Sequence, residues 1–474
     1  MIGREWERKE LDRALASDRS ELVIVYGRRR VGKTFLIEQH FNKKFDFWYV
    51  GAHGMKTRAQ LKNFANKLSE YTGITDYKFE DWLDAFLALK NYLKTLPDNR
   101  KKVVFIDEMP WMDTIRSDFV AALENFWNGW AMSQDNVMLI ATGSATSWMR
   151  DKIIANRGGL HARITCQLHL NPFTLHEVEL YLHGKGFKWD RYHILQSYML
   201  LGGVPFYYSL LERGQSLAQN IDTLFFNHEG KLRAEFDQLY NALFLHAEDY
   251  VEIVKHLSKH KFGLTYCELS EATGLDGVRL TKALKNLERC DFIDKWPHYG
   301  NKKKRQVFRL SDFYTLFYYR FIDKNNTHDE HWWSKNFNSQ EVNEWMGNSF
   351  EMVCLKHHRQ IKDALGLTVI STEISTWQCY PDKNEGTPGA QIDMIIERAD
   401  KYIHLCEIKF YSDKCHISQE YDSKLRTRMG FFRSVLKKDD MGLLNTFITT
   451  HGVANAVGHS IVDNDLTMDD LFRP

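Results

Sequence analysis

The sequence predicts an α/β fold that opens with a parallel β-sheet covered by helices. Apolar runs of strand length at residues 22–26, 103–106 and 137–141 alternate with helical patterns, as in parallel sheets that are buried on both faces. The glycine-rich segment GRRRVGKT, residues 27–34, directly follows the first run and opens a helical stretch. Two more apolar strands, joined by a charged turn, lie within residues 391–410 and predict a second α/β region.

The bulk composition indicates a folded protein of several domains. A chain of 474 residues is longer than one hydrophobic core supports, and about three domains are expected. With 43% hydrophobic residues and a formal net charge of +1, the composition excludes a disordered chain and gives no global argument for a nucleic-acid or membrane partner. The 7 cysteines form no CxxC pair, which argues against a disulfide framework or a zinc site. No apolar stretch approaches the ~20 residues of a membrane helix, so we expect a cytoplasmic protein without membrane contact.

The elements between these landmarks follow from periodicity. An amphipathic helix is expected at 4–16, an aromatic strand at 45–50 and a long helical region at 57–96. After Pro172 the pattern is mostly helical, and residues 249–322 read as three helices and a hairpin, the order of a winged helix. The expected domains are an α/β core at 1–170, a helical segment at 171–245, a winged helix at 246–322, a linker at 323–340 and a mixed α/β domain at 341–474.

The segment GRRRVGKT matches the phosphate-binding pattern GxxxxGK[ST]. Its position between a buried strand and a helix lets backbone N–H groups and the helix N-terminus converge on phosphate oxygens. Lys33 should reach the β- and γ-phosphates, and the Thr34 hydroxyl should bind Mg²⁺. The alternative is a simple glycine turn, which would not account for the position between a buried strand and a helix. The expected nucleotide contacts are Gly27, Arg28, Arg29, Arg30, Val31, Gly32, Lys33, Thr34 and Phe35.

The apolar run 103–106 ends in two acids that complete the expected nucleotide site. Asp107 should hold Mg²⁺, and Glu108 should orient and deprotonate the attacking water. Having both acids favours ATP hydrolysis over binding alone, and the alternative is a chance acidic strand end. The next strand ends in Thr142-Gly143-Ser144, where Thr142 or Ser144 could sense the γ-phosphate or could simply cap a helix.

Two arginines beyond this strand are candidates for an arginine finger. Arg157 and Arg163 lie in the segment NRGGLHARIT, and either could reach its own nucleotide or that of a neighbouring copy in a homo-oligomer. Surface arginines are common, so this assignment rests on position alone.

The segments GRRRVGKT, VVFIDE and ATGS, together with Gly202-Gly203-Val204-Pro205, resemble the archaeal-type ATPases of the STAND branch of AAA+ proteins. The resemblance spans almost the whole chain and implies a P-loop NTPase core with an AAA+-like parallel sheet, using ATP and Mg²⁺. In that family a GxP motif approaches the adenine side of the nucleotide, which would assign Gly203 and Pro205 here; the same residues also read as a helix stop and turn. The resemblance further implies a helical lid, a winged helix and a C-terminal nuclease-like domain.

The winged-helix segment carries a candidate DNA-binding face. Arg279, Lys282 and Lys285 share one side of its third helix, and the basic cluster at 302–305 lies at the tip of the expected wing. Only Asn286 is placed to read base edges, so any DNA binding should depend weakly on sequence. The alternatives are a solvated basic turn and an internal clamp.

The C-terminal strands carry a second cluster of charged residues. Asp393 lies on the first strand, and Glu407 and Lys409 share one face of the second by the period-2 rule. This resembles the PD-(D/E)XK nuclease constellation of a restriction-endonuclease-like fold, which implies that Asp393 and Glu407 bind the metal, that Lys409 steadies the attacking water and that Glu351 is an additional acid. The proline before the first acid is replaced by Ile392, and the alternative is a salt-bridged edge strand.

Taken together, the sequence predicts an ATPase that switches a metal-dependent, nuclease-like domain acting on DNA. One alternative is a regulatory or signalling ATPase whose C-terminal domain binds a partner or DNA without cleavage. Another is a nucleotide-loaded scaffold with negligible turnover.

Overall fold

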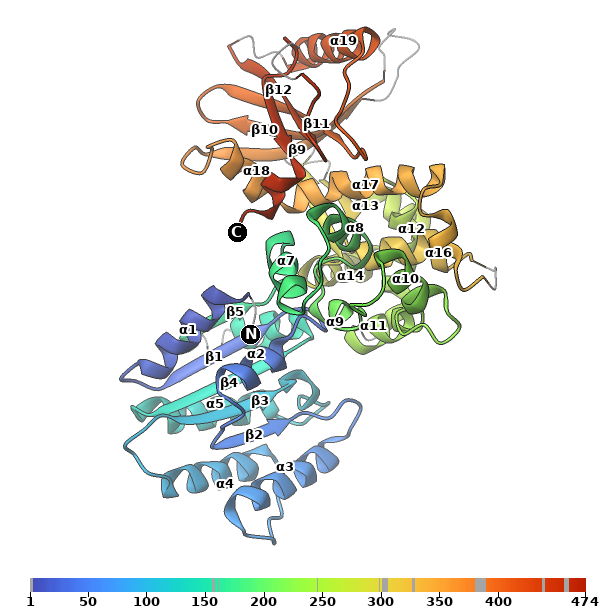
Figure 1. Cartoon of the computed structure of the whole chain (residues 1–474). Coiled ribbons are helices and arrows are strands. Elements are labelled where there is room, and N and C mark those ends of the chain that lie inside the picture. The colour runs from blue at the N-terminus through green and yellow to red at the C-terminus, as the bar shows by residue number, and fades with distance from the viewer. Residues whose placement is uncertain are drawn as a thin grey trace. The chain divides into compact units, whose positions relative to one another are not determined.

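The computed structural model describes the chain in two compact units (Figure 1). The described residues are 3–155, 158–160, 162–244, 246–297, 299–300, 306–325, 329–379, 389–436, 440–455 and 460–474. The first unit comprises Met1–Asn171 with Leu243–Leu245, and the second comprises Pro172–Ala242 with His246–Pro474. The boundary at 171/172 lies one residue beyond the position, 170, at which the first domain was expected to end.

The first unit is built on a five-stranded sheet in the order β2-β3-β4-β1-β5, in which every neighbouring pair is parallel. The predicted parallel sheet is therefore present. Its strands are β1 (Glu21–Tyr26), β2 (Phe47–Val50), β3 (Lys102–Asp107), β4 (Val137–Gly143) and β5 (Cys166–His169), and its helices are α1 (Glu5–Ala16), α2 (Lys33–His40), α3 (Thr57–Thr72), α4 (Trp82–Thr95), α5 (Phe119–Gly129) and the single turn α6 (Thr146–Trp148).

Alternate residues of the central strands bury two separate cores, one on each face of this sheet. Leu22, Val104 and Leu139 pack with α3, α4 and α5, whereas Val23 and Phe105 pack with α1 and α2. Figure 1 shows the same layering, with α3 and α4 on one side of the sheet and α1 on the other. Burial on both faces explains why these strands are continuous apolar runs.

The helical region expected at 57–96 is two helices rather than one. Gly73 follows α3 with φ +73°, a left-handed conformation that ends the helix. The next helix, α4, begins after Asp81, whose side chain accepts a hydrogen bond from the Asp84 amide. The sequence pattern did not resolve this break.

The second unit begins with the expected helical segment. Its helices are α7 (Leu175–Gly184), α8 (Arg191–Leu201), α9 (Pro205–Ser209), α10 (Leu217–Ile221), the π-helical turn η4 (Asp222–Phe226) and α11 (Glu235–Leu243). Gly203 lies between α8 and α9, where an added Cβ would come within 1.9 Å of the Phe173 carbonyl oxygen. The Phe173 amide also donates to the Gly203 carbonyl at 2.6 Å, so this glycine is required for close backbone packing.

Three helices and a small antiparallel sheet follow, which we call the helix–hairpin unit (residues 247–310). Its elements are α12 (Ala247–Ser258), β6 (Leu264–Thr265), α13 (Tyr266–Thr273), α14 (Gly277–Arg289), β7 (Ile293–Pro297) and β8 (Gln306–Leu310), with the strands in the order β6-β8-β7. The order is that expected of a winged helix, and the basic cluster at 302–305 lies outside the described residues.

The segment expected as a linker, 323–340, contains folded structure. After α15 (Phe313–Phe317) and η5 (Tyr318–Ile322), the short helix α16 (Trp332–Asn336) buries Trp333, which packs against Phe317 and Phe321. Both Trp333 and Ser334 donate their amides to Asp222. Aromatic burial therefore fixes this segment to the helical part of the unit, and only its polar start resembles a linker.

The C-terminal part is a mixed five-stranded sheet in the order β13-β12-β11-β10-β9. β9 (Thr372–Cys379), β10 (Ala390–Arg398) and β11 (Tyr402–Lys409) are antiparallel, whereas β12 (Gly442–Thr449) and β13 (Asn464–Thr467) run parallel to β11. The remaining elements are α17 (Gln340–Lys356), α18 (His358–Ala364), α19 (Gln419–Leu436) and η7 (Met468–Phe472).

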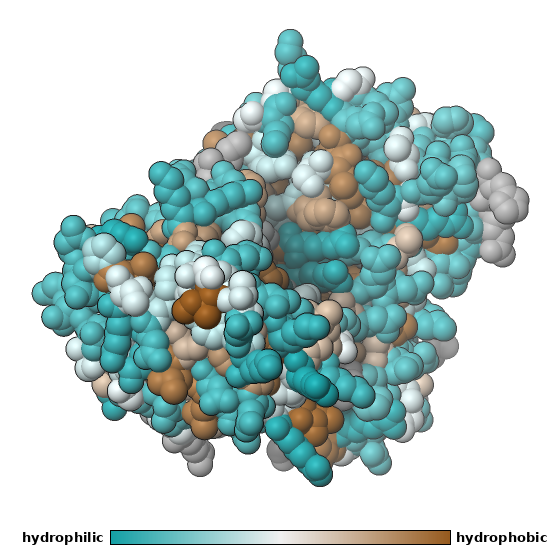
Figure 2. All heavy atoms as spheres, turned by 90° about the horizontal axis from the view of Figure 1, so that it is seen from below, coloured by the Kyte–Doolittle hydropathy of each residue, from teal (hydrophilic) through white to brown (hydrophobic). Residues whose placement is uncertain are grey.

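Hydrophilic side chains predominate on the face shown in Figure 2, and hydrophobic ones form small, separate groups. Among the described residues, no helix combines the length and apolar character needed to cross a bilayer.

Candidate functional site

The glycine-rich loop joins the carboxyl end of β1 to the start of α2. An added Cβ at Gly27 would lie 2.3 Å from the Leu170 carbonyl oxygen, so the loop starts tightly against the end of β5. Gly32 has φ +89°, which L side chains rarely adopt, and it forms the N-cap of α2. These two positions explain the glycines of the pattern, since one permits a close approach and the other a left-handed turn.

Lys33 is buried at the first residue of α2, and its ammonium group lies within the loop. Its Nζ donates to the carbonyl oxygens of Gly27 and Arg28, each at 3.0 Å, and to Ser144 Oγ at 2.8 Å. Charge-assisted hydrogen bonds to phosphate oxygens would be stronger than these bonds to carbonyl and hydroxyl oxygens.

Thr34 lies beside the acid expected to bind Mg²⁺. Its Oγ1 donates to Asp107 Oδ2 at 2.9 Å, and Thr142 donates to Asp107 Oδ1. Burial raises the pKa of Asp107, and the two hydroxyl hydrogen bonds oppose this shift only in part. A hydroxyl and a carboxylate oxygen side by side are hard oxygen donors that suit Mg²⁺, so the residues present fit the ion.

Glu108 is connected to Lys33 through a single side chain. It adopts a left-handed conformation, with φ +48°, and its carboxylate accepts hydrogen bonds from both the amide, at 3.0 Å, and the hydroxyl of Ser144. The Glu108 amide donates to Thr142 Oγ1 at 3.1 Å. The chain Lys33–Ser144–Glu108 therefore links the phosphate loop to the predicted base across β1, β4 and β3.

The other predicted nucleotide contacts have varied surroundings. Arg28 and Val31 are buried, Arg29 and Arg30 are half-buried, and Phe35 is exposed on α2. Arg163 is exposed and donates to Met132 Sδ at 2.9 Å, and Arg157 lies outside the described residues. Pro205 begins α9 in the second unit, so its approach to a nucleotide remains a prediction.

Asp393 of the second site lies at a β-bulge. The pairing of β10 with β9 shifts register between Ile392 and Ile395, and both isoleucines pack into the same core. Asp393 therefore lies where one extra residue interrupts the regular alternation of the strand. Its Oδ1 accepts the Gln391 side-chain amide at 2.8 Å, and burial raises the pKa of the Asp393 carboxyl.

Glu407 is held by a set of charged and polar partners on one face of the sheet. Lys409 Nζ lies 2.8 Å from Glu407 Oε1, which confirms that the two residues share a face. Tyr421 Oη donates to the same oxygen at 2.6 Å, and Arg428 of α19 forms an ion pair with Oε2. Burial alone would raise the pKa of Glu407, but Arg428 and Lys409 outweigh it and hold that pKa at about 2.

Glu351 does not join the other two acids in one metal-sized group. It forms a 2.9 Å ion pair with Lys261 of the helix–hairpin unit. Within the described residues, no three His, Cys, Asp or Glu side chains are placed to hold a metal ion together. Burial, together with the charge of Asp393, raises the pKa of Glu351, so the two acids are electrostatic neighbours without forming a closed three-acid site. Asp393 remains chemically suited to a divalent ion, whereas Glu407 is already neutralised.

The predicted DNA-binding face on α14 is partly engaged within the protein. Arg279 forms a 2.6 Å ion pair with Asp249, and Asn286 donates to Tyr250 Oη at 2.8 Å. The role expected for Asn286 in reading bases is therefore not supported, because its amide bonds within the unit. Lys282 and Lys285 are exposed.

The sequence reading missed three cations near the acidic residues. Arg428 lies 21 residues from Glu407, and Lys261 lies 90 residues from Glu351. Arg309 of β8 is buried and interacts with the charges of Glu351 and Asp393. Local patterns carry no signal for such long-range pairs; only the basic character of α19 could have suggested Arg428.

Comparison with known proteins agrees with the geometry of the first unit. Residues 1–208 match the family model of an ATPase domain found predominantly in archaea. The chain is 23% identical to an uncharacterized protein of Methanocaldococcus jannaschii over 479 aligned positions, which cover 99% of each chain.

Several solved structures are similar to this chain at low sequence identity. The Walker-type ATPase of Pyrococcus abyssi is 17% identical, with a TM-score of 0.49, over 68% of this chain and 96% of that one. The ORC2 protein of Aeropyrum pernix is 16% identical, with a TM-score of 0.41, over 67% and 93%. A STAND protein of Pyrococcus horikoshii with a tetratricopeptide repeat sensor is 16% identical, with a TM-score of 0.32, over 78% and 48%.

The loop geometry and the matching family model lead to the same conclusion. Residues 1–208 match an archaeal-type ATPase domain in sequence, and the loop geometry agrees with that match.

Proposed function

We propose that this protein is a cytoplasmic, ATP-hydrolysing switch whose nucleotide state controls a metal-dependent, nuclease-like C-terminal domain that acts on DNA. The main support for a switch is the series of hydrogen bonds from Lys33 through Ser144 to Glu108. One hydroxyl group joins the lysine that would bind phosphate to the acid that would activate water. A change in the hydrogen bonds of Lys33 is therefore expected to alter the position of Glu108.

ATP binding would rearrange this chain. The phosphates offer Lys33 charged acceptors in place of two carbonyl oxygens and Ser144 Oγ, and charge-assisted hydrogen bonds are the stronger ones. Ser144 is then free to turn toward the γ-phosphate, which loosens its hold on the Glu108 carboxylate. Glu108 can then orient a water for attack and accept its proton. Mg²⁺, held by Thr34 and Asp107, would supply charge stabilisation at the phosphates.

The C-terminal assignment rests on Asp393, Glu407 and Lys409. Lys409 is fixed beside Glu407 at 2.8 Å, and its pKa is raised because the two nearby acids outweigh its burial. It would therefore act as a charged group that positions water or a phosphate oxygen. A metal ion, if bound, would be held by Asp393 and stabilise charge on the phosphate.

A second function, DNA or partner binding without cleavage, is favoured by the state of Glu407. Both of its carboxylate oxygens have cationic partners, Lys409 and Arg428. An acid so neutralised has little remaining affinity for a metal ion. In that case the ATPase would regulate binding and not cutting.

The nucleotide site is tested by the Glu108→Gln substitution. Loss of the base should lower ATP hydrolysis by ~10²–10⁴-fold while ATP affinity is retained, because no phosphate contact is removed. The conservative Glu124→Gln substitution on α5 serves as the control. Hydrolysis at the wild-type rate in Glu108→Gln would refute the assignment of the base.

Nuclease activity is tested with plasmid, linear and single-stranded DNA in Mg²⁺ or Mn²⁺, with and without ATP. We expect cleavage by the wild type, its loss in Asp393→Asn, and loss of its ATP dependence in Lys33→Ala. Equal cutting by wild type and Asp393→Asn would exclude this site. DNA binding without any cutting would select the second function.

Arg163 is proposed as an arginine finger acting on a neighbouring copy, since it is exposed in the first unit. Mixing Arg163→Ala with Glu108→Gln should then restore hydrolysis, because each variant supplies what the other lacks. An unchanged rate in Arg163→Ala alone would remove the proposal.

A further inference from the structure

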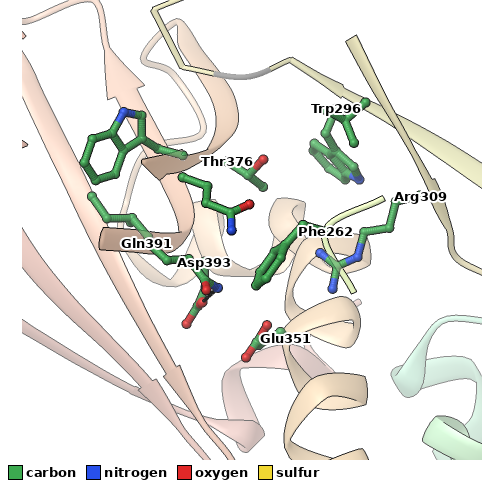
Figure 3. A pocket seen from close by; sticks show the side chains of 11 residues that line it. Phe262, Trp296, Arg309, Glu351, Thr376, Gln391 and Asp393 are labelled. Atoms are coloured by element: carbon green, nitrogen blue, oxygen red, sulfur yellow. Dashed lines mark hydrogen bonds between the residues drawn. The ribbon is translucent and has the colours of Figure 1, made fainter. Parts of the chain in front are cut away.

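A small cavity lies where the helix–hairpin unit meets the acids of the C-terminal sheet. Its volume is about 50 Å³, and Phe262, Trp296 and Arg309 line it from one side, with Asp393 and Glu351 on the other. Figure 3 shows the Phe262 ring between Asp393 and Arg309, with Glu351 beneath them. This volume holds roughly three to five water molecules, which is the size of a hydrated ion or one phosphate group and too small for a nucleotide.

Arg309 is an unusual residue to find in such a cavity. It is 8% exposed, and its Nε has no hydrogen-bond partner among the described residues. Burial lowers the pKa of Arg309, although the charges of Glu351 and Asp393 oppose the shift. A buried guanidinium group with an unused donor is costly, and an anion at the cavity would satisfy that donor.

A second, larger groove meets the cavity at Arg309. It has a volume of about 840 Å³, and both Lys261 and Arg309 line it. Its other cationic side chains are Lys255, Lys259, Arg320 and Lys324, and its acidic ones are Asp323, Glu341 and Glu344. Arg320 pairs with Glu341 at 3.0 Å, whereas no ion pair is recorded for Lys255, Lys259 or Lys324 within the described part of the chain. The groove is thus basic overall and leads to the acids of the cavity.

We propose that this groove and cavity bind a single-stranded nucleic acid, with Lys261 and Arg309 of the helix–hairpin unit holding a backbone phosphate opposite Asp393 and Glu351. The groove is large enough for nucleotides, and the cavity accepts only the phosphate. Arginine presents a fork of donors that matches phosphate oxygens, and Lys261 can exchange Glu351 for phosphate.

Aromatic side chains favour a single strand over a duplex. Phe262 lines the cavity but is 38% exposed, so an unpaired base lying outside the cavity could stack on the exposed part of its ring, and Trp296 is half-buried beside it. Stacking on aromatic rings beside a cationic groove is the usual way to hold single strands without reading their sequence. The bases of a duplex are already stacked and would gain nothing there.

Binding at this site rests on the proposed function only where cleavage of the bound strand is concerned. The phosphate contacts of the C-terminal site are assigned to residues of another part of the chain. Binding is also predicted in the absence of cleavage.

The test is equilibrium binding of fluorescent 12-nucleotide probes to the full chain, in EDTA and in Ca²⁺, as a function of salt. The probes are single-stranded DNA, single-stranded RNA and duplex DNA. Arg309→Gln should weaken single-strand binding about tenfold and reduce the salt slope by about one. Lys261→Ala should act in the same direction, and Arg433→Gln, an exposed arginine of α19 outside both cavities, should change neither quantity. DNA and RNA binding equally would show that the phosphate backbone is the shared ligand, and a preference for one would identify its source.

Folding of the variants is checked by circular dichroism, and Arg309→Lys provides a second variant that keeps the charge. It should recover part of the lost affinity. Unchanged or tighter binding in folded Arg309→Gln, or tighter binding of duplex than of single strands, would overturn the proposal. If binding depends on Arg309 but the wild type cuts no substrate, only the nuclease function fails.

Discussion

The carboxylates of the nucleotide site are held by hydroxyl groups, whereas Glu407 in the C-terminal site is held by cations. Asp107 accepts hydrogen bonds from Thr34 and Thr142, and Glu108 accepts from Ser144. Glu407 instead pairs with Lys409 and Arg428. Their pKa values accordingly move in opposite directions: that of Asp107 is raised by burial, and that of Glu407 is held at about 2.

This difference separates two acids that can still attract a cation, Asp107 and Glu108, from one, Glu407, that already has two cationic partners. Hydroxyl groups stabilise a carboxylate without cancelling its charge, so a cation entering beside Asp107 gains the full attraction. An acid whose charge is already balanced by cations attracts a further cation much less strongly. The charge of Asp107 is therefore left for a ligand to balance, whereas the charge of Glu407 is balanced by basic residues of the protein itself.

The largest expected effect is the loss of ATP hydrolysis in Lys33→Ala. Removing this ammonium group breaks its hydrogen bond to Ser144, takes one charged partner away from the phosphates and uncouples Glu108. We expect a fall of ~10³-fold or more in the rate, comparable to the loss of a preorganised transition-state donor. Lys44→Ala, an exposed lysine after α2, is the control for the assay of phosphate release. A rate within threefold of wild type in Lys33→Ala would remove the contrast between the sites.

A second effect concerns stability in the C-terminal site. Arg428→Met should destabilise the second unit by about 2–3 kcal/mol at neutral pH, because it leaves the buried Glu407 carboxylate with one cation. Urea unfolding followed by tryptophan fluorescence measures this loss, with Arg433→Met as the control on the same helix. An unaltered unfolding midpoint would mean that Arg428 contributes little to holding Glu407.

The pH dependence tests the same ion pairs in the wild type. The pKa of Glu407 is lowered from 4.5 in the unfolded chain to about 2, so its contribution is complete above pH 4.5 and is lost as the pH falls toward 2. The full loss is about 3 kcal/mol by linkage. The Glu407→Gln variant should show a shallower decline of stability over this range. Parallel curves for both proteins would contradict the depressed pKa.

The smallest expected effect is that of a single hydroxyl group in the nucleotide site. Thr142→Val keeps the shape of a fully buried side chain but removes the hydroxyl that donates to Asp107. We expect a loss of about 1–2 kcal/mol in the stability of the first unit, less than for Arg428→Met. Thr146→Val, also fully buried, has only a 3.5 Å bond to a carbonyl oxygen and is the matched control. Equal losses in Thr142→Val and Thr146→Val would show that the Asp107 contact is not special.

Much of the fold could be predicted from sequence, because strands buried on both faces are continuous apolar runs that can be recognised locally. The apolar runs before Gly27 and Asp107 are strands β1 and β3, within one residue of their expected starts. The break at Gly73 was missed because helical periodicity continues on both sides of it. The start of α16 was missed because polar residues before Trp332 outweighed the two adjacent tryptophans that bury it.

The candidate site divides in the same way. Lys33, Thr34 and Asp107 follow from loop and strand patterns, and their hydrogen bonds bring them together as expected. Arg309 and Arg428 could not be found in this manner, because each reaches the acids through tertiary packing of distant segments. Whether an acid is neutralised is decided by such partners and not by the strand that carries it.

The bulge at Asp393 has a consequence for how this site can vary. Ile392 and Ile395 pack into one core although they are three positions apart. One extra residue therefore shifts the alternation of side chains between the two parts of the strand. Deleting a residue there would restore strict alternation and send the carboxylate to another face, with every side chain chemically unchanged. The direction of this acid is therefore encoded by the length of the chain, and a comparison that matches only residue types would overlook its loss.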